Sequence, residues 1–194
     1  RAPMREDGTA GAALAPGEKA LLEGPIGSGK TTLLLRIAGL REGPGRVLVG
    51  GAEMKGRALA AARRGMGFLW QNPDDGLFLP GVLEDVALGP VNDGLLPALA
   101  EDRARAALAA VGAAYLAGRE LPGLSRGERQ LVAIAGLLAR EPGLLLLDEP
   151  LSALDPGARG RVLALLAAHP ATVLLATHDG GEAARAAGFG GAVR

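Results

Sequence analysis

Apolar residues recur along this chain in two alternating patterns, short continuous runs and longer stretches with helical spacing. The short runs predict buried strands over residues 20–23, 46–49, 66–70, 144–147 and 172–177, and the start of another at 192–193. Helical spacing predicts helices over residues 31–40, 58–64, 157–168 and 180–187. Strands that alternate with helices indicate an α/β fold with a mostly parallel sheet.

This alternation stops between residues 73 and 139. Helical patterns follow one another there, without a strand pattern between them, over residues 82–88, 99–111 and 126–140. Prolines separate these helical patterns, at Pro80, Pro90, Pro97 and Pro122. We therefore expect one domain over residues 1–194, with a sheet core (about 1–72 and 140–194) and an inserted helical subdomain (about 73–139).

Composition and charge narrow the possible classes of protein. The chain has 194 residues, 48% of them apolar, which is typical of one globular domain with a full core. It carries 21 basic and 21 acidic residues without a strongly basic stretch, which argues against direct nucleic-acid binding. The absence of cysteine excludes disulfides, thiolate metal sites and a cysteine nucleophile. No apolar run approaches the roughly 18–20 residues that span a bilayer, so a role at a membrane would need a spanning partner.

Residues 24–31 read GPIGSGKT and match the phosphate-binding pattern G-x-x-x-x-G-K-[ST] at every fixed position. The pattern lies between a predicted strand and a predicted helix, where free backbone N–H groups bind an anion. Lys30 can reach the β and γ oxygens of ATP, and the Thr31 hydroxyl can bind Mg²⁺. The predicted nucleotide contacts are Gly24, Pro25, Ile26, Gly27, Ser28, Gly29, Lys30, Thr31 and Thr32. The alternative is a glycine-rich turn with a chance lysine.

A second candidate site follows the strand predicted at residues 144–147, where four leucines lead into Asp148 and Glu149. Buried carboxylates are costly unless they serve a cation or a proton. We predict that Asp148 lies in the Mg²⁺ shell and that Glu149 orients and deprotonates the attacking water. The alternative is a strand end whose acids are simply solvated.

Together with four further motifs, these two resemble the nucleotide-binding domain of ATP-binding-cassette (ABC) ATPases. Gln71 ends a predicted strand, as the glutamine loop of that family does. Residues 124–128, LSRGE, are similar to the family's signature motif, and residues 152–155, SALD, to the loop that crosses to the partner subunit. His178 follows a predicted strand and resembles the switch histidine. The six motifs occur in the family's order.

The resemblance implies the P-loop ABC-ATPase fold and catalytic roles for three residues, Glu149, His178 and Gln71. It implies an Mg²⁺ site made of Thr31, Gln71 and Asp148. It also implies a second ABC ATPase subunit, identical or related, and an ATP molecule shared with that subunit's signature motif. The signature residues concerned are Ser125, Gly127 and Glu128.

Two of these motifs have simpler interpretations, and two positions depart from the family pattern. Ser125 and Glu128 also form an S-x-x-E capping box, which is compatible with a phosphate-binding role, and His178 alone would be an ordinary surface histidine. Arg126 and Glu128 stand where the commonest signature has glycine and glutamine. No aromatic residue precedes Phe68, although the family stacks adenine on one upstream of the phosphate loop.

Residues 71–78 and 84–90, QNPDDGLF and EDVALGP, resemble the ATPase subunits of energy-coupling-factor importers, which include cobalt and nickel importers. This resemblance implies a transmembrane coupling subunit, a substrate-capture subunit for a metal ion or vitamin, and a place at the cytoplasmic face of the cell membrane. Leu77, Phe78 and Leu79 would form an apolar lip that receives a helix of the membrane partner. Alternatively, these three residues belong to the core of the helical subdomain.

Two other functional classes compete with a transport ATPase. Non-transport ABC proteins act on DNA or ribosomes, but the 54-residue step from Gln71 to Ser125 is too short for a chromosome-maintenance coiled coil. Ribosome-associated members usually carry two cassettes, whereas this chain has one set of motifs. A small P-loop kinase would need neither the signature nor His178.

Overall fold

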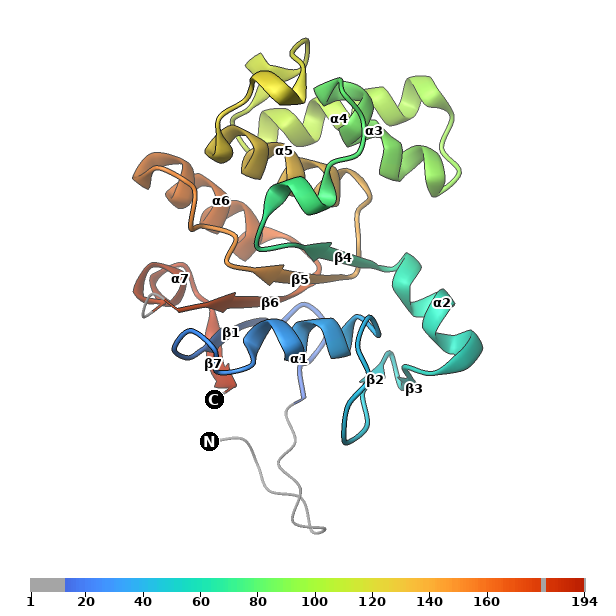
Figure 1. Ribbon diagram of the computed structural model, residues 1–194, viewed down its shortest axis with the longest axis vertical. Coiled ribbons are helices and arrows are strands. Elements are labelled where there is room, and N and C mark those ends of the chain that lie inside the picture. Colours follow the sequence, from blue (N-terminus) through green and yellow to red (C-terminus); the bar gives the residue numbers. More distant parts are fainter. Residues whose placement is uncertain (1–12, 179–180, 194) are drawn as a thin grey trace.

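A five-stranded parallel sheet forms the centre of the computed structural model, which describes residues 13–178 and 181–193 (Figure 1). Its spatial order is β4-β5-β6-β1-β7, and every neighbouring pair is parallel. The strands are β1 (Lys19–Glu23), β4 (Met66–Leu69), β5 (Leu144–Asp148), β6 (Thr172–Thr177) and β7 (Gly190–Val193). Because all five run in one direction, the loops that follow them meet along one edge of the sheet.

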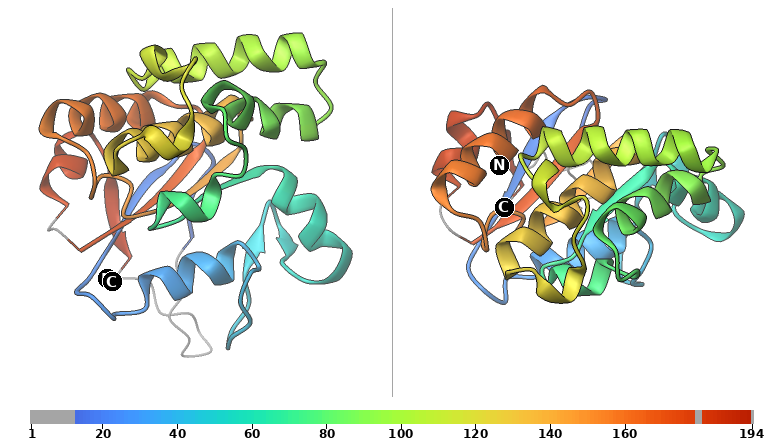
Figure 2. Two further views of the ribbon diagram at one scale, coloured as in Figure 1. Left: turned by 45° about the horizontal axis from the view of Figure 1, so that its top comes forward. Right: turned by 90° about the horizontal axis from the view of Figure 1, so that it is seen from above.

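Helices cover both faces of this sheet. Alternate strand residues point to opposite faces, so Leu22, Leu146 and Leu174 share a cluster with Leu34 of α1 (Lys30–Ile37). Their sequence neighbours share the larger cluster with residues of α5 (Arg126–Ala139) and α6 (Pro156–Ala168). These neighbours are Leu21, Leu145, Leu147, Val173 and Leu175. Figure 2 shows the sheet between α1 and the helices of the other face.

Helices occupy the stretch between β4 and β5 and gather at one end of the molecule (Figure 1). The main helices are α3 (Val82–Asn92), α4 (Pro97–Ala110) and α5, and they pack on one another through a buried apolar set that includes Val86, Leu108 and Val132. Short 3₁₀ turns join them: η1 (Pro73–Gly76), η2 (Ala114–Leu116) and η3 (Leu121–Gly123). Pro90 does not separate helices as predicted, because it lies in the last turn of α3, where a proline removes only one late hydrogen bond.

The predicted α/β fold with a parallel sheet is confirmed, with one wrong strand assignment. Residues 46–49 do not join the main sheet. Only β2 (Leu48–Val49) is a strand, and it pairs antiparallel with β3 (Ala52–Glu53) in a separate two-stranded hairpin. The turn between them is Gly50-Gly51, with φ of 57° and 80°, and this left-handed backbone at both positions is what a two-residue hairpin requires.

Some predicted boundaries also shift. The first helix ends at Ile37 rather than residue 40, because Gly39 adopts a left-handed φ of 66° and stops it. The second helix, α2 (Gly56–Arg64), starts two residues before its predicted start. The last helix, predicted over 180–187, is α7 (Glu182–Ala186), and residue 180 lies outside the described residues. The division into a sheet core and a helical subdomain at residues 73 and 139 stays a prediction.

None of the helices in the described ranges is both long and apolar enough to cross a membrane.

Candidate active site

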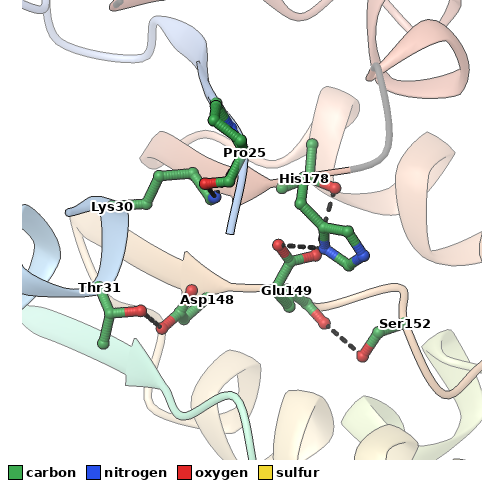
Figure 3. Close-up of polar contacts among 9 residues, drawn as sticks. Pro25, Lys30, Thr31, Asp148, Glu149, Ser152 and His178 are labelled. Atoms are coloured by element: carbon green, nitrogen blue, oxygen red, sulfur yellow. Dashed lines mark hydrogen bonds and ion pairs between the residues drawn. The ribbon is translucent and has the colours of Figure 1, made fainter. Parts of the chain in front are cut away.

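Three loops that follow neighbouring strands bring the predicted catalytic and phosphate-binding side chains together (Figure 3). The loop after β1 leads into α1 and carries Lys30 and Thr31. Asp148 ends β5 and is followed by Glu149, while His178 follows β6. Since β5, β6 and β1 are adjacent and parallel, side chains that are more than a hundred residues apart in sequence become neighbours.

The loop over residues 24–29 has a backbone that wraps closely around the Lys30 ammonium group. Lys30 Nζ donates to the carbonyl oxygens of Gly24, at 2.7 Å, and Pro25, at 3.0 Å (Figure 3). Gly27 and Gly29 have φ of 81° and 91°, a left-handed backbone that favours glycine. The first helical bond runs from the Leu33 N–H to the Gly29 carbonyl, so the amides of Lys30, Thr31 and Thr32 at the start of α1 have no partner within the helix and can bind an anion.

Asp148 and Thr31 form the next part of the site. The Thr31 hydroxyl donates to Asp148 Oδ2 at 2.6 Å, across 117 residues of sequence. Asp148 is only 2% exposed, and this burial raises the pKa of its carboxyl group, an effect that the Thr31 hydrogen bond opposes.

This hydroxyl–carboxylate pair has the hard oxygen donors that Mg²⁺ prefers. Across residues 13–178 and 181–193, no cluster of three or more His, Cys, Asp or Glu side chains could hold a metal ion alone. A site with one carboxylate and one hydroxyl instead fits a cation whose other ligands are water and phosphate oxygens. The residues present therefore fit Mg²⁺ that is bound together with a nucleotide.

Glu149 is held in a strained position between the ends of two strands. It is 6% exposed and has a φ of 50°, a left-handed conformation that is rare for a residue with a side chain. Its N–H donates to the Ala176 carbonyl at 3.0 Å, and its own carbonyl accepts from the Ser152 hydroxyl at 3.1 Å. Strain of this kind persists only where the surroundings impose it, and it is concentrated at functional sites.

Two side chains from the end of β6 contact the Glu149 carboxylate. Thr177 Oγ1 donates to Oε2 at 3.2 Å, and His178 Nδ1 lies 2.7 Å from Oε1 (Figure 3). The sequence argument missed Thr177, although a hydroxyl residue that ends a buried strand beside a catalytic motif was a usable signal. These contacts direct a buried carboxylate toward the loop edge, where a carboxylate can accept a proton.

Gln71 is the candidate that the structure connects least to this group. It lies two residues beyond the end of β4, the strand next to β5, and it is exposed. Within the described residues, its side chain makes no hydrogen bond to Asp148 or Glu149. Its roles as an Mg²⁺ ligand and in catalysis stay predictions.

The signature residues lie at the start of α5. The Glu128 N–H donates to Ser125 Oγ at 3.2 Å, and the Ser125 N–H donates to Glu128 Oε2 at 2.8 Å, so the predicted capping box is confirmed. The hydrogen bond from the Ser125 N–H, and after it the Ser125 side chain, lowers the pKa of the Glu128 carboxyl group. Gly127 lies against the loop that follows Glu149, since a Cβ added there would be 2.8 Å from the Ala153 carbonyl oxygen. The predicted phosphate contacts of Ser125, Gly127 and Glu128 remain predictions.

The residues of the predicted apolar lip differ in whether they are exposed or belong to the core. Leu77 packs against the main core, as in the second interpretation, whereas Phe78 is 74% exposed. The backbone N–H groups of Phe78 and Leu79 donate to Asp85 Oδ1 at 2.6 and 2.8 Å. Asp85 is buried, and its burial raises the pKa of its carboxyl group despite these bonds. The exposed phenyl ring is thus presented by an anchored backbone.

Comparison with known proteins places this geometry in a family. Residues 10–152 match the family described as ABC transporter. A Gloeobacter violaceus protein named provisionally as an ABC transporter ATP-binding protein is 49% identical over 170 residues, covering 86% of this chain and 70% of that protein. The energy-coupling factor transporter ATP-binding protein EcfA of Methanocaldococcus jannaschii is 41% identical over 169 residues, covering 84% of this chain and 61% of that protein.

Solved structures give the same result. CbiO1 of Clostridium perfringens, described as part of the ABC transporter complex CbiONQ, is 32% identical with a TM-score of 0.75, covering 87% of this chain and 70% of that one. The ATP-binding cassette MJ0796, a dimer in a post-hydrolysis state bound to ADP and Pi, is 30% identical with a TM-score of 0.82, covering 90% of this chain and 80% of that one. The chain therefore belongs to the ABC transporter family and is an ABC-type ATPase domain that resembles the ATP-binding subunits of energy-coupling-factor importers.

Proposed function

We propose that this chain hydrolyses Mg²⁺-ATP between two like ATPase domains and thereby powers a membrane importer of the energy-coupling-factor type. The observation that carries the proposal is the convergence of Lys30, Thr31, Asp148, Glu149 and His178 on one edge of the sheet. This set combines a phosphate-binding loop, donors for a cation and a carboxylate that can take a proton. Hydrolysis of a phosphoanhydride needs these three elements.

In this proposal, Lys30 and the backbone amides of the loop over residues 24–32 bind the phosphate groups. Thr31 and Asp148, with the Gln71 side-chain oxygen, would hold Mg²⁺, which neutralises charge on the β and γ oxygens when bound. Glu149 takes a proton from water as the water oxygen bonds to the γ-phosphorus and the bond to the β–γ bridging oxygen breaks. ADP and phosphate are the products.

Thr177 and His178 keep the Glu149 carboxylate in its orientation during this step. The ring of His178 lies beside the carboxylate, and in this proposal it also contacts the γ-phosphate when ATP is bound. His178 would thereby sense the γ-phosphate. The distance between His178 Nδ1 and Glu149 Oε1, 2.7 Å, is that of a direct hydrogen bond.

A second ABC ATPase subunit completes the site in the proposal. Its Ser125, Gly127 and Glu128 would approach the γ-phosphate with the N-terminus of its α5, where the helix dipole favours an anion. The dimeric state of the MJ0796 cassette supports this arrangement. ATP binding then closes the pair, and hydrolysis reopens it.

The transport role rests on the likeness to EcfA and to CbiO1. We propose that a helix of a transmembrane coupling subunit packs on Phe78, an exposed side chain whose backbone N–H is anchored by Asp85. A separate membrane subunit would capture the solute, a cobalt or nickel ion or a vitamin. The chain would then work at the cytoplasmic face of the cell membrane.

Two experiments test nucleotide binding and the transport role separately. Calorimetric titration with Mg²⁺-ATP should give heat and protect the amides of residues 24–31 from hydrogen exchange, and the absence of both would refute nucleotide binding there. Affinity purification from the native membrane should recover transmembrane subunits, and the complex in vesicles should take up labelled cobalt, nickel or a vitamin with ATP. Recovery of ribosomes or DNA instead would overturn the transport role but leave the ATPase intact.

A further inference from the structure

Gln130 is a fully buried amide in the helix that begins at the signature motif. It lies on the second turn of α5, with 0% of its surface exposed. Its Nε2 donates to the carbonyl oxygen of Pro150, one residue after Glu149, at 3.2 Å. Its Oε1 is also buried and has no hydrogen-bond partner in the part of the chain that the structure describes. The amide therefore makes one polar contact, and that contact is with the turn after Glu149.

The unpaired Oε1 shows that stability alone does not account for an amide at this position. A buried acceptor without a donor is destabilising. A methionine or leucine would fill similar volume without that acceptor. What an apolar side chain cannot do is donate to the Pro150 carbonyl.

The same loop touches α5 a second time, one turn earlier. A Cβ on Gly127 would lie 2.8 Å from the Ala153 carbonyl oxygen, so the backbones are in close contact there. Between these two contacts, the Ser152 hydroxyl and N–H both donate to the Glu149 carbonyl, at 3.1 and 3.2 Å. The segment from Glu149 to Ala153 is thus bounded on one side by α5.

Glu149 needs such external restraints. Its left-handed φ of 50° is unfavourable for a glutamate, and of its main-chain groups the sheet holds the N–H, through the Ala176 carbonyl. The peptide that follows must be held by something else. Of the side chains described, Gln130 is the one that bonds to the Pro150 carbonyl.

We propose that Gln130 is a positioning residue for ATP hydrolysis, which fixes the turn after Glu149 and thereby the direction of its carboxylate. The proposal rests on the function proposed above, in which Glu149 is the general base. With this role for Gln130, α5 rigidly links the signature residues to the general base of the same chain. The helix carries the signature residues at its start and holds the turn after Glu149.

The test compares Gln130→Met with Leu131→Met in the full-length chain. Both put methionine into buried positions of α5, and only the first removes the donor to Pro150. We expect kcat of Gln130→Met to fall about 10- to 100-fold, since misplacing a catalytic group by about 1 Å has effects of that size. The Kd for ATP should stay within about twofold of the wild type, and Leu131→Met should keep the wild-type kcat.

Hydrogen exchange gives a second measurement. The amides of Ser152 and Leu154 bond to the carbonyls of Glu149 and Leu151, and both should exchange faster in Gln130→Met than in Leu131→Met. A wild-type kcat in Gln130→Met would overturn the proposal. A Gln130→Met variant in which kcat, ATP affinity and melting temperature all fall together would also overturn it. So would a failure of both Gln130→Met and Gln130→Leu to fold, because each of these outcomes would make Gln130 merely structural.

The proposed function is tested apart from this inference by Glu149→Gln. If that variant hydrolyses ATP normally, Glu149 is not the base and the proposed mechanism fails whatever Gln130 does. If Glu149→Gln is inactive and Gln130→Met is fully active, only the positioning role fails.

Discussion

His178 Nδ1 lies 2.7 Å from Glu149 Oε1, although 29 residues separate the two along the chain. The contact follows from the sheet, because β5 and β6 are parallel neighbours in register, with Asp148 opposite Ala176. Both strands end at the same edge of the sheet, so the residues that follow them, Glu149 and His178, lie opposite each other. The contact places an imidazole ring against a buried carboxylate, where the ring can respond to the charge and the surroundings of that carboxylate.

Replacing Glu149 by glutamine should nearly abolish ATP hydrolysis while leaving ATP bound. An amide of the same shape keeps the contacts with Thr177 and His178 but cannot accept a proton from water, and loss of a general base costs about 10²–10⁴ in rate. Steady-state phosphate release should show this loss. Size-exclusion chromatography with ATP should show a more persistent dimer than the wild type forms.

Glu101→Gln makes the same chemical change at a half-exposed side chain on α4 and serves as the control. It should hydrolyse ATP at the wild-type rate. Rapid turnover by Glu149→Gln, with Glu101→Gln also active, would remove Glu149 from its role as base.

Replacing Lys30 by alanine should weaken ATP binding. The ammonium group donates to the Gly24 and Pro25 carbonyls, and in the proposed function it binds the phosphates of ATP. Charge-assisted hydrogen bonds contribute roughly 1.5–3 kcal/mol, so we expect Kd to rise about 10- to 100-fold in calorimetry. Lys55→Ala removes an exposed lysine that pairs with Glu53 and should leave Kd unchanged. Equal affinity in the Lys30 variant and the wild type would contradict the phosphate-loop assignment.

The fold was predictable from sequence wherever an element carried its own pattern. Continuous apolar runs such as residues 144–147 and 172–177 marked the central strands, because a parallel strand covered on both faces has no polar side. The hairpin of β2 and β3 was misassigned because its two-residue strands are too short for a periodic signal. Its Gly50-Gly51 turn was the available clue.

Sequence motifs name candidate residues for the site but do not predict their geometry. A motif can say that Asp148 and Glu149 follow a strand, whereas the left-handed φ of Glu149 depends on what surrounds it. Likewise, Thr177 and His178 reach Glu149 only through the register of β5 and β6. Periodicity in one segment carries no information on register between segments, so such pairs need the folded chain.

Ser125→Ala and Glu128→Ala should separate helix capping from phosphate contact. Each substitution removes one of the two reciprocal hydrogen bonds of the capping box, so each should lower the free energy of unfolding by about 1 kcal/mol. Denaturant unfolding measures this loss. In the proposed dimer both residues approach the γ-phosphate of the partner's ATP, but of the two side chains only the Ser125 hydroxyl can donate a hydrogen bond to it, so Ser125→Ala should lose clearly more ATPase activity than Glu128→Ala. Equal activities would assign Ser125 to capping alone.

Replacing Asp148 by asparagine should stabilise the protein without metal while it removes Mg²⁺-dependent hydrolysis. Burial raises the pKa of the Asp148 carboxyl group in the folded state above its ordinary value of 3.8. Between the ordinary and the raised pKa, the folded state binds more protons than the unfolded state, so stability falls as pH rises. Above the raised pKa the loss is complete and constant. Asparagine lacks this titration and can still accept the Thr31 hydrogen bond.

The free energies of unfolding of Asp148→Asn and the wild type should therefore diverge as pH rises from about 4, with the variant more stable, and then differ by a constant amount. Urea unfolding in EDTA across pH 4–8 measures the difference. Mg²⁺-ATP should then stabilise the wild type more than the variant, because binding to the folded state alone adds to stability and the carboxylate is the stronger Mg²⁺ ligand. A variant that is less stable than the wild type at every pH, or that gains as much from Mg²⁺-ATP, would contradict a buried carboxylate held ready for a cation.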